Sequence, residues 1–174
     1  MKKTSLWQLR CPKGVYLCLL NERIVKKELT WKVNKFTELT TDELYAILHL
    51  RCKIFVMEQN APYLDMDYKD QCALHLQGWL DNSLVAYCRI FRAGDYFDEA
   101  SIGRVIVAKE YREYGYGHDL MKRAIEIEED VLNESQITIS AQLYLKNFYE
   151  RHGFRQTSDT YLEDGLPHIQ MKRE

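Results

Sequence analysis

The sequence lacks several features that would assign it at once to a functional class. Its apolar runs are far shorter than the roughly 20 residues that a membrane-spanning helix needs. Its five cysteines form no CxxC pair, so a zinc or redox site has no support. The formal net charge is only −2, and this balance gives no general reason to expect nucleic-acid or membrane binding.

What is present is the composition of an ordinary globular protein. The chain has 174 residues, of which 46% are hydrophobic and 29% are charged. A chain of this length can bury most of its apolar surface within one domain. The irregularly spaced cysteines favour free buried thiols over disulfides, which is typical of a reducing compartment. We therefore expect a single cytoplasmic domain.

Residues 1–27 differ from the rest of the chain. They hold seven Lys and Arg residues against one acid, Glu22. The apolar run 14–20 resembles a secretory signal, but no small-residue cleavage site follows it. We interpret residues 1–27 as a basic extension of a domain that spans 28–174. Nucleic-acid binding by this extension is the weakest alternative, since the extension lacks aromatic residues in a stacking order.

Hydrophobic periodicity predicts alternating strands and helices from residue 30 onward. Thr40 and Glu43 form a capping box at the start of the first helix. Asp81-Asn82 supplies the turn between two strands, and His152-Gly153 is a helix C-terminal signal. The expected strands are 31–36, 73–80, 83–92, 100–107, 137–141, 154–161 and 167–172, and the expected helices are 40–58, 117–131 and 143–151.

The turn between strand 100–107 and the helix that follows is the most informative segment. It reads Arg112-Glu113-Tyr114-Gly115-Tyr116-Gly117. Glycines allow unusual backbone angles and let a ligand approach the main chain closely. The helix begins at the second glycine and points its partially positive end at the same place. Strand, turn and helix together predict a phosphate-binding unit.

Two common phosphate-binding motifs are absent. A nucleoside-triphosphate P-loop needs GxxxxGK followed by Ser or Thr, and the sequence has no such run. A dinucleotide fold needs GxGxxG after its first strand, but residues 115–120 lack the third glycine and lie two-thirds along the chain. An acyl-coenzyme A pyrophosphate site is the remaining interpretation.

The turn 112–117 matches the R/Q-x-x-G-x-G/A motif of the GNAT N-acetyltransferase superfamily. Residues 143–154 (LYLKNFYERHGF) resemble the later motif of that family, in which a Phe-Tyr pair precedes Gly-Phe. Residues 50–63, 102–105 and 161–169 resemble its ElaA-like branch more specifically. The resemblance covers about residues 31–172, and its motifs occur in the family's order and spacing.

The resemblance implies an α/β (α+β) fold, a mixed and mostly antiparallel sheet flanked by helices, with two splayed central strands. It implies direct acetyl transfer from acetyl-CoA to the primary amine of a small molecule or peptide, with no metal. A non-catalytic acyl-CoA-binding or protein-interaction module of the same fold is the alternative, and we leave a homodimer open. Acids near 58–70 and 163–164 weakly favour a cationic acceptor.

The resemblance also implies where the cofactor lies. The splayed strand would pair with the pantetheine arm, and the turn would bind pyrophosphate mainly through its N–H groups, because hydrogen bonds to charged groups contribute about 1.5–3 kcal/mol each and the helix terminus only about 0.3–1 kcal/mol. The expected cofactor-binding residues are Val105, Ile106, Val107, Arg112, Glu113, Tyr114, Gly115, Tyr116, Gly117, His118 and Asn147.

Tyr149 occupies the family's position for a general acid that stabilises the departing thiolate. A phenol with a pKa near 10 is protonated at neutral pH and can donate a hydrogen bond. Many relatives have Asn and Ala where this chain has Gln142 and Leu145, which weakens a direct cofactor contact at Gln142.

The base that deprotonates the amine is less well defined. Glu58 and His75 are the first candidates, because Glu58 ends the first helical segment and His75 starts a strand near the cleft. Glu163, Asp164 and His168 follow, and we expect Asp164 and His168 to contact the acceptor. A water chain is an alternative that needs no dedicated base.

Overall fold

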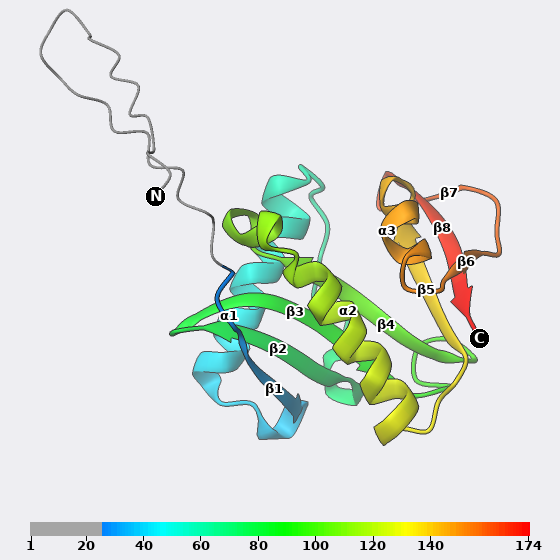
Figure 1. Ribbon diagram of the computed structural model, residues 1–174. Coiled ribbons are helices and arrows are strands. Elements are labelled where there is room, and N and C mark those ends of the chain that lie inside the picture. Colours follow the sequence, from blue (N-terminus) through cyan, green and yellow to red (C-terminus); the bar gives the residue numbers. More distant parts are fainter. Residues whose placement is uncertain (1–25) are drawn as a thin grey trace, which may run out of the picture.

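The computed structural model describes residues 26–174 and arranges them as one sheet with helices on both faces (Figure 1). The helices are α1 (Thr41–Arg51), α2 (Tyr116–Glu126) and α3 (Lys146–Glu150). The strands are β1 (Thr30–Lys35), β2 (Leu74–Leu80), β3 (Ser83–Phe91), β4 (Ala100–Val107), β5 (Ile137–Gln142), β6 (Arg155–Gln156), β7 (Tyr161–Glu163) and β8 (Leu166–Arg173).

The sheet has the order β1-β2-β3-β4-β5-β8-β6, and β7 pairs with β8. All neighbours are antiparallel except β4 and β5, which are parallel. This parallel pair is joined only at Ala100–Ile137 and Ser101–Thr138, after which the strands diverge (Figure 1). The mixed, mostly antiparallel sheet with splayed central strands is therefore confirmed.

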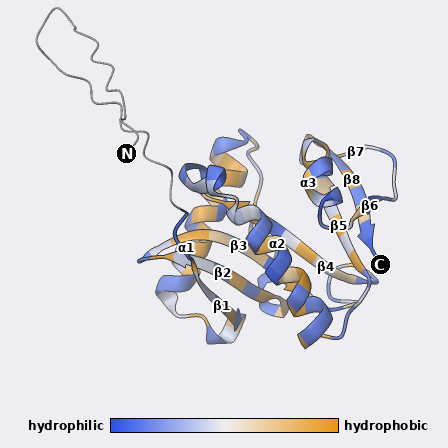
Figure 2. Ribbon diagram, in the orientation of Figure 1, coloured by the Kyte–Doolittle hydropathy of each residue, from blue (hydrophilic) through white to orange (hydrophobic). Residues whose placement is uncertain are grey.

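Two hydrophobic clusters fix the layers. Leu120, Met121 and Ala124 of α2 are fully buried against one face of the sheet, together with Ile102 of β4 and Ile139 of β5. On the other face, the helical segment 41–58 packs its apolar residues against β3 and β4 in a second cluster. Figure 2 shows the viewer's side of α2 as mostly hydrophilic, as an amphipathic helix on a sheet requires.

The first helix begins where its capping box predicts. The Thr40 hydroxyl accepts from the Glu43 backbone N–H, and the Glu43 carboxylate accepts from the Thr40 N–H. The helical path then reaches Glu58, as expected, but residues 52–58 form a π-helix. Asn60, at a left-handed φ of +51°, ends it. A π-helical segment also extends α2 over 127–131.

One expected strand, 154–161, is interrupted and forms two short strands. β6 and β7 both pair with β8 but are separated at Ser158. The Ser158 hydroxyl accepts from the Gln170 backbone N–H at 2.8 Å, so a side chain replaces the backbone in the ladder there. The expectation of a continuous strand was therefore wrong at this residue.

The basic extension predicted over residues 1–27 lies, apart from Lys26 and Lys27, outside the described residues. Among residues 26–174, the helices are all too short or too polar to span a bilayer.

A buried carboxyl in the core has no partner. Glu128 is fully buried beside the end of α2, and neither of its carboxylate oxygens has a hydrogen-bond partner among the described residues. Burial raises the pKa of Glu128 to about 8, and the charge of Glu134 adds to this rise while Arg92 opposes it. Because folding favours the neutral form, ionisation of Glu128 destabilises the fold progressively as pH rises from about 4.5 to about 8.

We expect Glu128→Gln to raise the free energy of unfolding by about 2–4 kcal/mol at pH 8, because it removes the ionisation cost. At pH 4.5 the variant and the wild type should unfold at nearly the same urea concentration. Asp130→Asn, an exposed acid two residues away, is the control and should shift stability by less than about 0.5 kcal/mol at both pH values. A gain of equal size at both pH values would contradict this account.

Candidate functional site

The turn 112–117 has the geometry of an anion site. Gly115 has a φ of +75°, which only glycine adopts without strain, and it precedes the first residue of α2. The Gly115 carbonyl accepts from the N–H groups of His118 and Asp119. By helix geometry, the amides of Tyr116 and Gly117 have no intrahelical acceptor and are left for a ligand.

Gly117 is not required by packing. A methyl group at this position would lie 3.6 Å from the Phe148 ring and 3.8 Å from Val107, which are ordinary van der Waals contacts. Gly117 also does not have a positive φ. The reason for glycine is therefore external to the folded chain, and close approach of a ligand to the backbone supplies one.

The side chain of Tyr116 points away from this site. It is buried, and its hydroxyl donates to the Lys27 carbonyl at 2.7 Å. A pocket of about 460 Å³ lies on that side of α2, lined by residues 26–31 and the outer face of the helix. Of the predicted cofactor-binding residues, Tyr116 alone lines this pocket, so its contribution to the donor site would come from its backbone N–H.

Arg112 and Glu58 bind each other. The guanidinium donates to both carboxylate oxygens, at 2.5 Å and 3.0 Å, and its Nε donates to the Val107 carbonyl at 3.1 Å. This bidentate pair ties the predicted phosphate-binding arginine to the end of the helical segment 52–58. Because both Glu58 oxygens are engaged, the geometry favours Glu58 as a partner that orients Arg112 over its predicted role as base.

Tyr149 follows Phe148, which packs against the turn 112–117 and the start of α2. Its neighbour Phe148 packs on Gly117 and on the His118 ring, with a ring-centroid distance of 4.9 Å to His118. The Tyr149 side chain is buried, and burial raises the pKa of its phenol, so the hydroxyl keeps its proton. Phe148 thus connects α3 to the start of α2, and Asn147 is exposed at the start of α3.

His118 has a partner that the sequence does not reveal. Its Nδ1 lies 2.9 Å from Nε2 of His152, and the Phe148 ring lies against both imidazoles. Burial lowers the pKa of His152, and the charge of His118 lowers it further. The two histidines are 34 residues apart, His118 in α2 and His152 in the turn after α3, so no local spacing identifies them as a pair.

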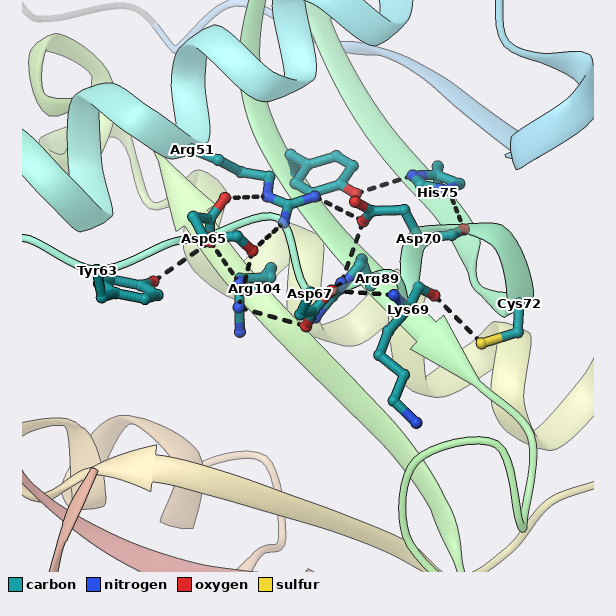
Figure 3. A network of polar contacts seen from close by, with 11 residues as sticks. Arg51, Tyr63, Asp65, Asp67, Lys69, Asp70, Cys72, His75, Arg89 and Arg104 are labelled. Atoms are coloured by element: carbon teal, nitrogen blue, oxygen red, sulfur yellow. Dashed lines mark hydrogen bonds and ion pairs between the residues drawn. The ribbon is translucent and has the colours of Figure 1, made fainter. Parts of the chain in front are cut away.

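The acid-rich loop after the first helix is neutralised internally. Asp65 accepts from Arg51 of α1 and Arg104 of β4, each at 2.7 Å. Asp70 accepts from Arg51 at 2.6 Å and from Arg89 of β3 at 3.1 Å. Figure 3 shows these contacts. We call the following six residues the Arg–Asp network: Arg51, Arg89, Arg104, Asp65, Asp67 and Asp70.

Asp67 completes this network with a bidentate contact. Both of its oxygens accept from Arg89, at 2.7 Å and 2.8 Å. Burial acts to raise the pKa of Asp67, but the hydrogen bonds and charge of Arg89 outweigh it and hold the pKa well below its ordinary value. Arg51 and Arg89 are at most 1% exposed, so these charges face one another rather than solvent.

The network corrects the interpretation of residues 58–70 as a surface that attracts cations. Three aspartates meet three arginines there, and Glu58 is paired with Arg112. The residues that alternate with these acids point outward instead: Leu64 is 71% exposed and Tyr68 is 87% exposed. Of the two acidic segments, only 163–164 is left to favour a cationic acceptor.

His75, the other first candidate for the base, lies in the core. It is fully buried, its Nε2 donates to the Asp70 carbonyl at 3.0 Å, and its Nδ1 accepts from the Tyr87 hydroxyl at 2.8 Å. Burial lowers the pKa of His75 and keeps the ring neutral. With both nitrogens engaged, His75 serves to hold the loop that carries the aspartates, and this placement does not support the base role.

β5 presents its polar side chains to the face that carries the Arg–Asp network. Ile137, Ile139 and Ala141 face α2, so the alternate residues Thr138, Ser140 and Gln142 face the opposite side. Gln142 exchanges two hydrogen bonds with Gln59, at 3.0 Å and 3.4 Å. This amide pair lies at the end of β5 where β4 and β5 are apart. It engages the Gln142 side chain, whose direct contact with the cofactor the departure from the family pattern already weakened.

The segment that holds the remaining predicted acceptor residues contacts Ser140 through Tyr161 and Glu163. Its hydroxyl lies 2.6 Å from both the Tyr161 hydroxyl and the Glu163 carboxylate. The Tyr161 ring stacks on His168, whose Nδ1 donates to the Leu166 carbonyl at 2.8 Å. Asp164 and Gly165 form the β7–β8 turn, both at positive φ. Sequence reasoning missed Ser140 and Tyr161, because only the β5–β8–β7 pairing brings them together.

Comparisons with known proteins agree with this geometry. The family model described as "Acetyltransferase (GNAT) domain" matches residues 54–174. Protein ElaA of Escherichia coli K12 is 40% identical over 148 residues, which cover 84% of this chain and 97% of ElaA. The crystal structure of E. coli ElaA superposes with a TM-score of 0.79, over 84% of this chain and 99% of ElaA. A Pseudomonas aeruginosa structure titled "Acyl-CoA N-acyltransferase" is 38% identical, with a TM-score of 0.79 over 84% and 100% of the two chains.

Proposed function

Because the chain belongs to the GNAT acetyltransferase family as an ElaA-like member, we propose that it transfers an acetyl group from acetyl-CoA directly to a primary amine. The family membership supports an acyltransferase that uses an acyl-CoA donor. The acetyl donor, the amine acceptor and the residues that serve them are the proposal. The free thiols of Cys52, Cys72 and Cys88 are compatible with the cytoplasmic location that we propose for it.

One observation carries the proposal: β4 and β5 separate after two residue pairs, and the anion turn follows the end of β4. Beyond Ser101, the β5-facing edge of β4 has backbone groups without a strand partner, over the residues predicted to bind the cofactor (Val105, Ile106 and Val107). A pantetheine arm carries amide groups that can pair with such an edge. Its pyrophosphate would then reach the amides of Tyr116 and Gly117 and compete with Glu58 for Arg112.

The chemistry proposed is attack of the neutral amine nitrogen on the thioester carbonyl. The C–N bond forms, the C–S bond breaks, coenzyme A leaves as a thiolate, and the attacking nitrogen gives one proton to water. Tyr149 stabilises that thiolate by donating a hydrogen bond. Because its pKa is raised, complete transfer of its proton to the sulfur is unfavourable. Positioning both reactants in the splay accounts for much of the rate.

We expect Tyr149→Phe to lower kcat by about 10²–10³-fold, because the variant has no donor for the thiolate. The Kd for coenzyme A should stay within about twofold, since hydrogen bonds from the turn carry the affinity. Steady-state thiol release and calorimetric titration measure the two quantities. Tyr45→Phe, an exposed tyrosine on α1, is the matched control.

An unchanged kcat in the Tyr149→Phe variant would remove Tyr149 from the mechanism. Coenzyme A binding without transfer by the wild type, across alkylamine, arylamine and peptide acceptors, would favour the alternative of a binding module.

A further inference from the structure

The polar group around Ser140 contains a carboxylate that has no cation partner among the described residues. Glu163 of β7 accepts from Ser140 at 2.6 Å, and among residues 26–174 no Lys, Arg or His side chain lies within 4.0 Å of it. On the facing side, by contrast, every aspartate of the Arg–Asp network is paired with an arginine. The carboxylate of Glu163 therefore keeps its negative charge without a cation partner among the described residues.

Hydrogen-bond directions around Glu163 can be assigned. An ionised carboxylate only accepts, so the single Ser140 hydrogen goes to Glu163 and the Tyr161 hydroxyl donates to Ser140. This chain of two hydroxyls holds one oxygen of Glu163 and leaves the other without a protein donor among the described side chains. Ser140 and Tyr161 are thus positioning residues for the carboxylate.

His168 supplies a second acceptor beside Tyr161. Its side chain is 8% exposed, and its Nδ1 must carry the hydrogen that the Leu166 carbonyl accepts. In the neutral ring, Nε2 is then an acceptor, and it has no partner among residues 26–174. This nitrogen is not sealed from solvent, so a ligand atom can reach it, and the His168 ring stacks on Tyr161 at a centroid distance of 6.2 Å.

Resting on the proposed function, we propose that Glu163 and His168 Nε2 bind the protonated amine of the acceptor, which is therefore an alkylammonium compound. The bound ammonium gives one proton to water before its nitrogen attacks the thioester. A primary ammonium has three N–H donors and no acceptor, and this site offers acceptors and a negative charge but no free donor. An arylamine is neutral at pH 7 and gains little from the carboxylate. A carboxylate-bearing group would be repelled by Glu163.

The test compares two acceptors in one enzyme. In Glu163→Gln the amide has the size of the carboxylate and still accepts from Ser140, so the variant removes mainly the charge. We expect KM for an alkylamine to rise about 10–100-fold, while KM for an arylamine of similar size changes less than about threefold. The Kd for coenzyme A should be unchanged. Asp159→Asn, an exposed acid between β6 and β7, is the charge-matched control and should alter neither KM.

The positioning role of Ser140 is tested separately, by the KM for the alkylamine. Ser140→Ala should raise KM for the alkylamine in the same direction but less, and Ser140→Thr, which restores the hydroxyl, should recover it. Equal loss for alkylamine and arylamine in Glu163→Gln would overturn the ammonium site while leaving acetyl transfer intact. Transfer by the wild type to neither class, despite coenzyme A binding, would overturn the proposed function and the ammonium site with it.

Discussion

Asp70→Asn is expected to lower the free energy of unfolding by about 3–5 kcal/mol, the usual cost of leaving a buried charge without its partner. Asp70 accepts from Arg51 and Arg89, which are 0% and 1% exposed. Asparagine has the same size but no charge, so two guanidinium groups would share two aspartates with Arg104. Urea denaturation at pH 7 measures the loss.

The control for Asp70→Asn is Asp119→Asn. Asp119 pairs with Lys26 at 2.5 Å, but both side chains are more than 40% exposed. A pair of this kind contributes about 0–1 kcal/mol, because solvent screens it. Equal losses in the free energy of unfolding would mean that the buried Arg–Asp network stabilises the fold no more than an exposed ion pair does.

Gly117→Asp is expected to raise the Kd for coenzyme A at least about 100-fold, because a carboxylate beside the pyrophosphate adds like-charge repulsion of several kcal/mol. The fold should tolerate the change. The added Cβ meets only ordinary contacts with Phe148 and Val107, and an acid in the first turn of a helix stabilises it by about 0.3–1 kcal/mol. Calorimetric titration with coenzyme A and thermal unfolding separate the two effects.

Lys122→Asp is the matched control for Gly117→Asp. It also places a carboxylate on α2, but at a residue whose side chain is 76% exposed and faces solvent. Its effect on the Kd should be less than about threefold at physiological ionic strength, because salt screens distant charges. A wild-type Kd in Gly117→Asp would mean that coenzyme A does not approach the N-terminus of α2.

Local signals in the sequence were sufficient for much of the fold. The Thr40–Glu43 capping box, the Asp81-Asn82 turn and the glycine turn 112–117 each depend on a few neighbouring residues, and each is present in the structure. The splayed central strands were predicted from the family resemblance and not from hydrophobic periodicity. The π-helical segments were missed, because an apolar pattern of a few residues does not distinguish a π turn from an α turn.

The acceptor half of the site was harder to predict, because its contacts join distant residues. Asp65 and Arg104 are 39 residues apart, and Ser140 and Glu163 are 23 apart. An acid-rich loop has the same composition whether it faces solvent or three buried arginines. Only the tertiary structure distinguishes the neutralised loop from the unpaired Glu163. The argument for a cationic acceptor therefore depends on residues 163–164 and no longer on residues 58–70.

The pairing of β3 with β4 contains a bulge, which has a consequence for solubility: Tyr87 pairs with Ile106 and Arg89 with Gly103, so β4 has one extra residue there. A strand edge with unpaired backbone groups is a template on which another chain can add as a strand, and here such an edge lies in the middle of the sheet. The pairing register of β3 and β4 shifts beside Arg104. This residue has a φ of +52°, and its side chain donates to Asp65. A bulged edge cannot match the regular spacing of an incoming strand, and the Gln59–Gln142 pair lies across its open end. The bulged edge thus discourages aggregation with a second polypeptide, and it would not exclude in the same way the narrow, flexible pantetheine arm that we propose for it.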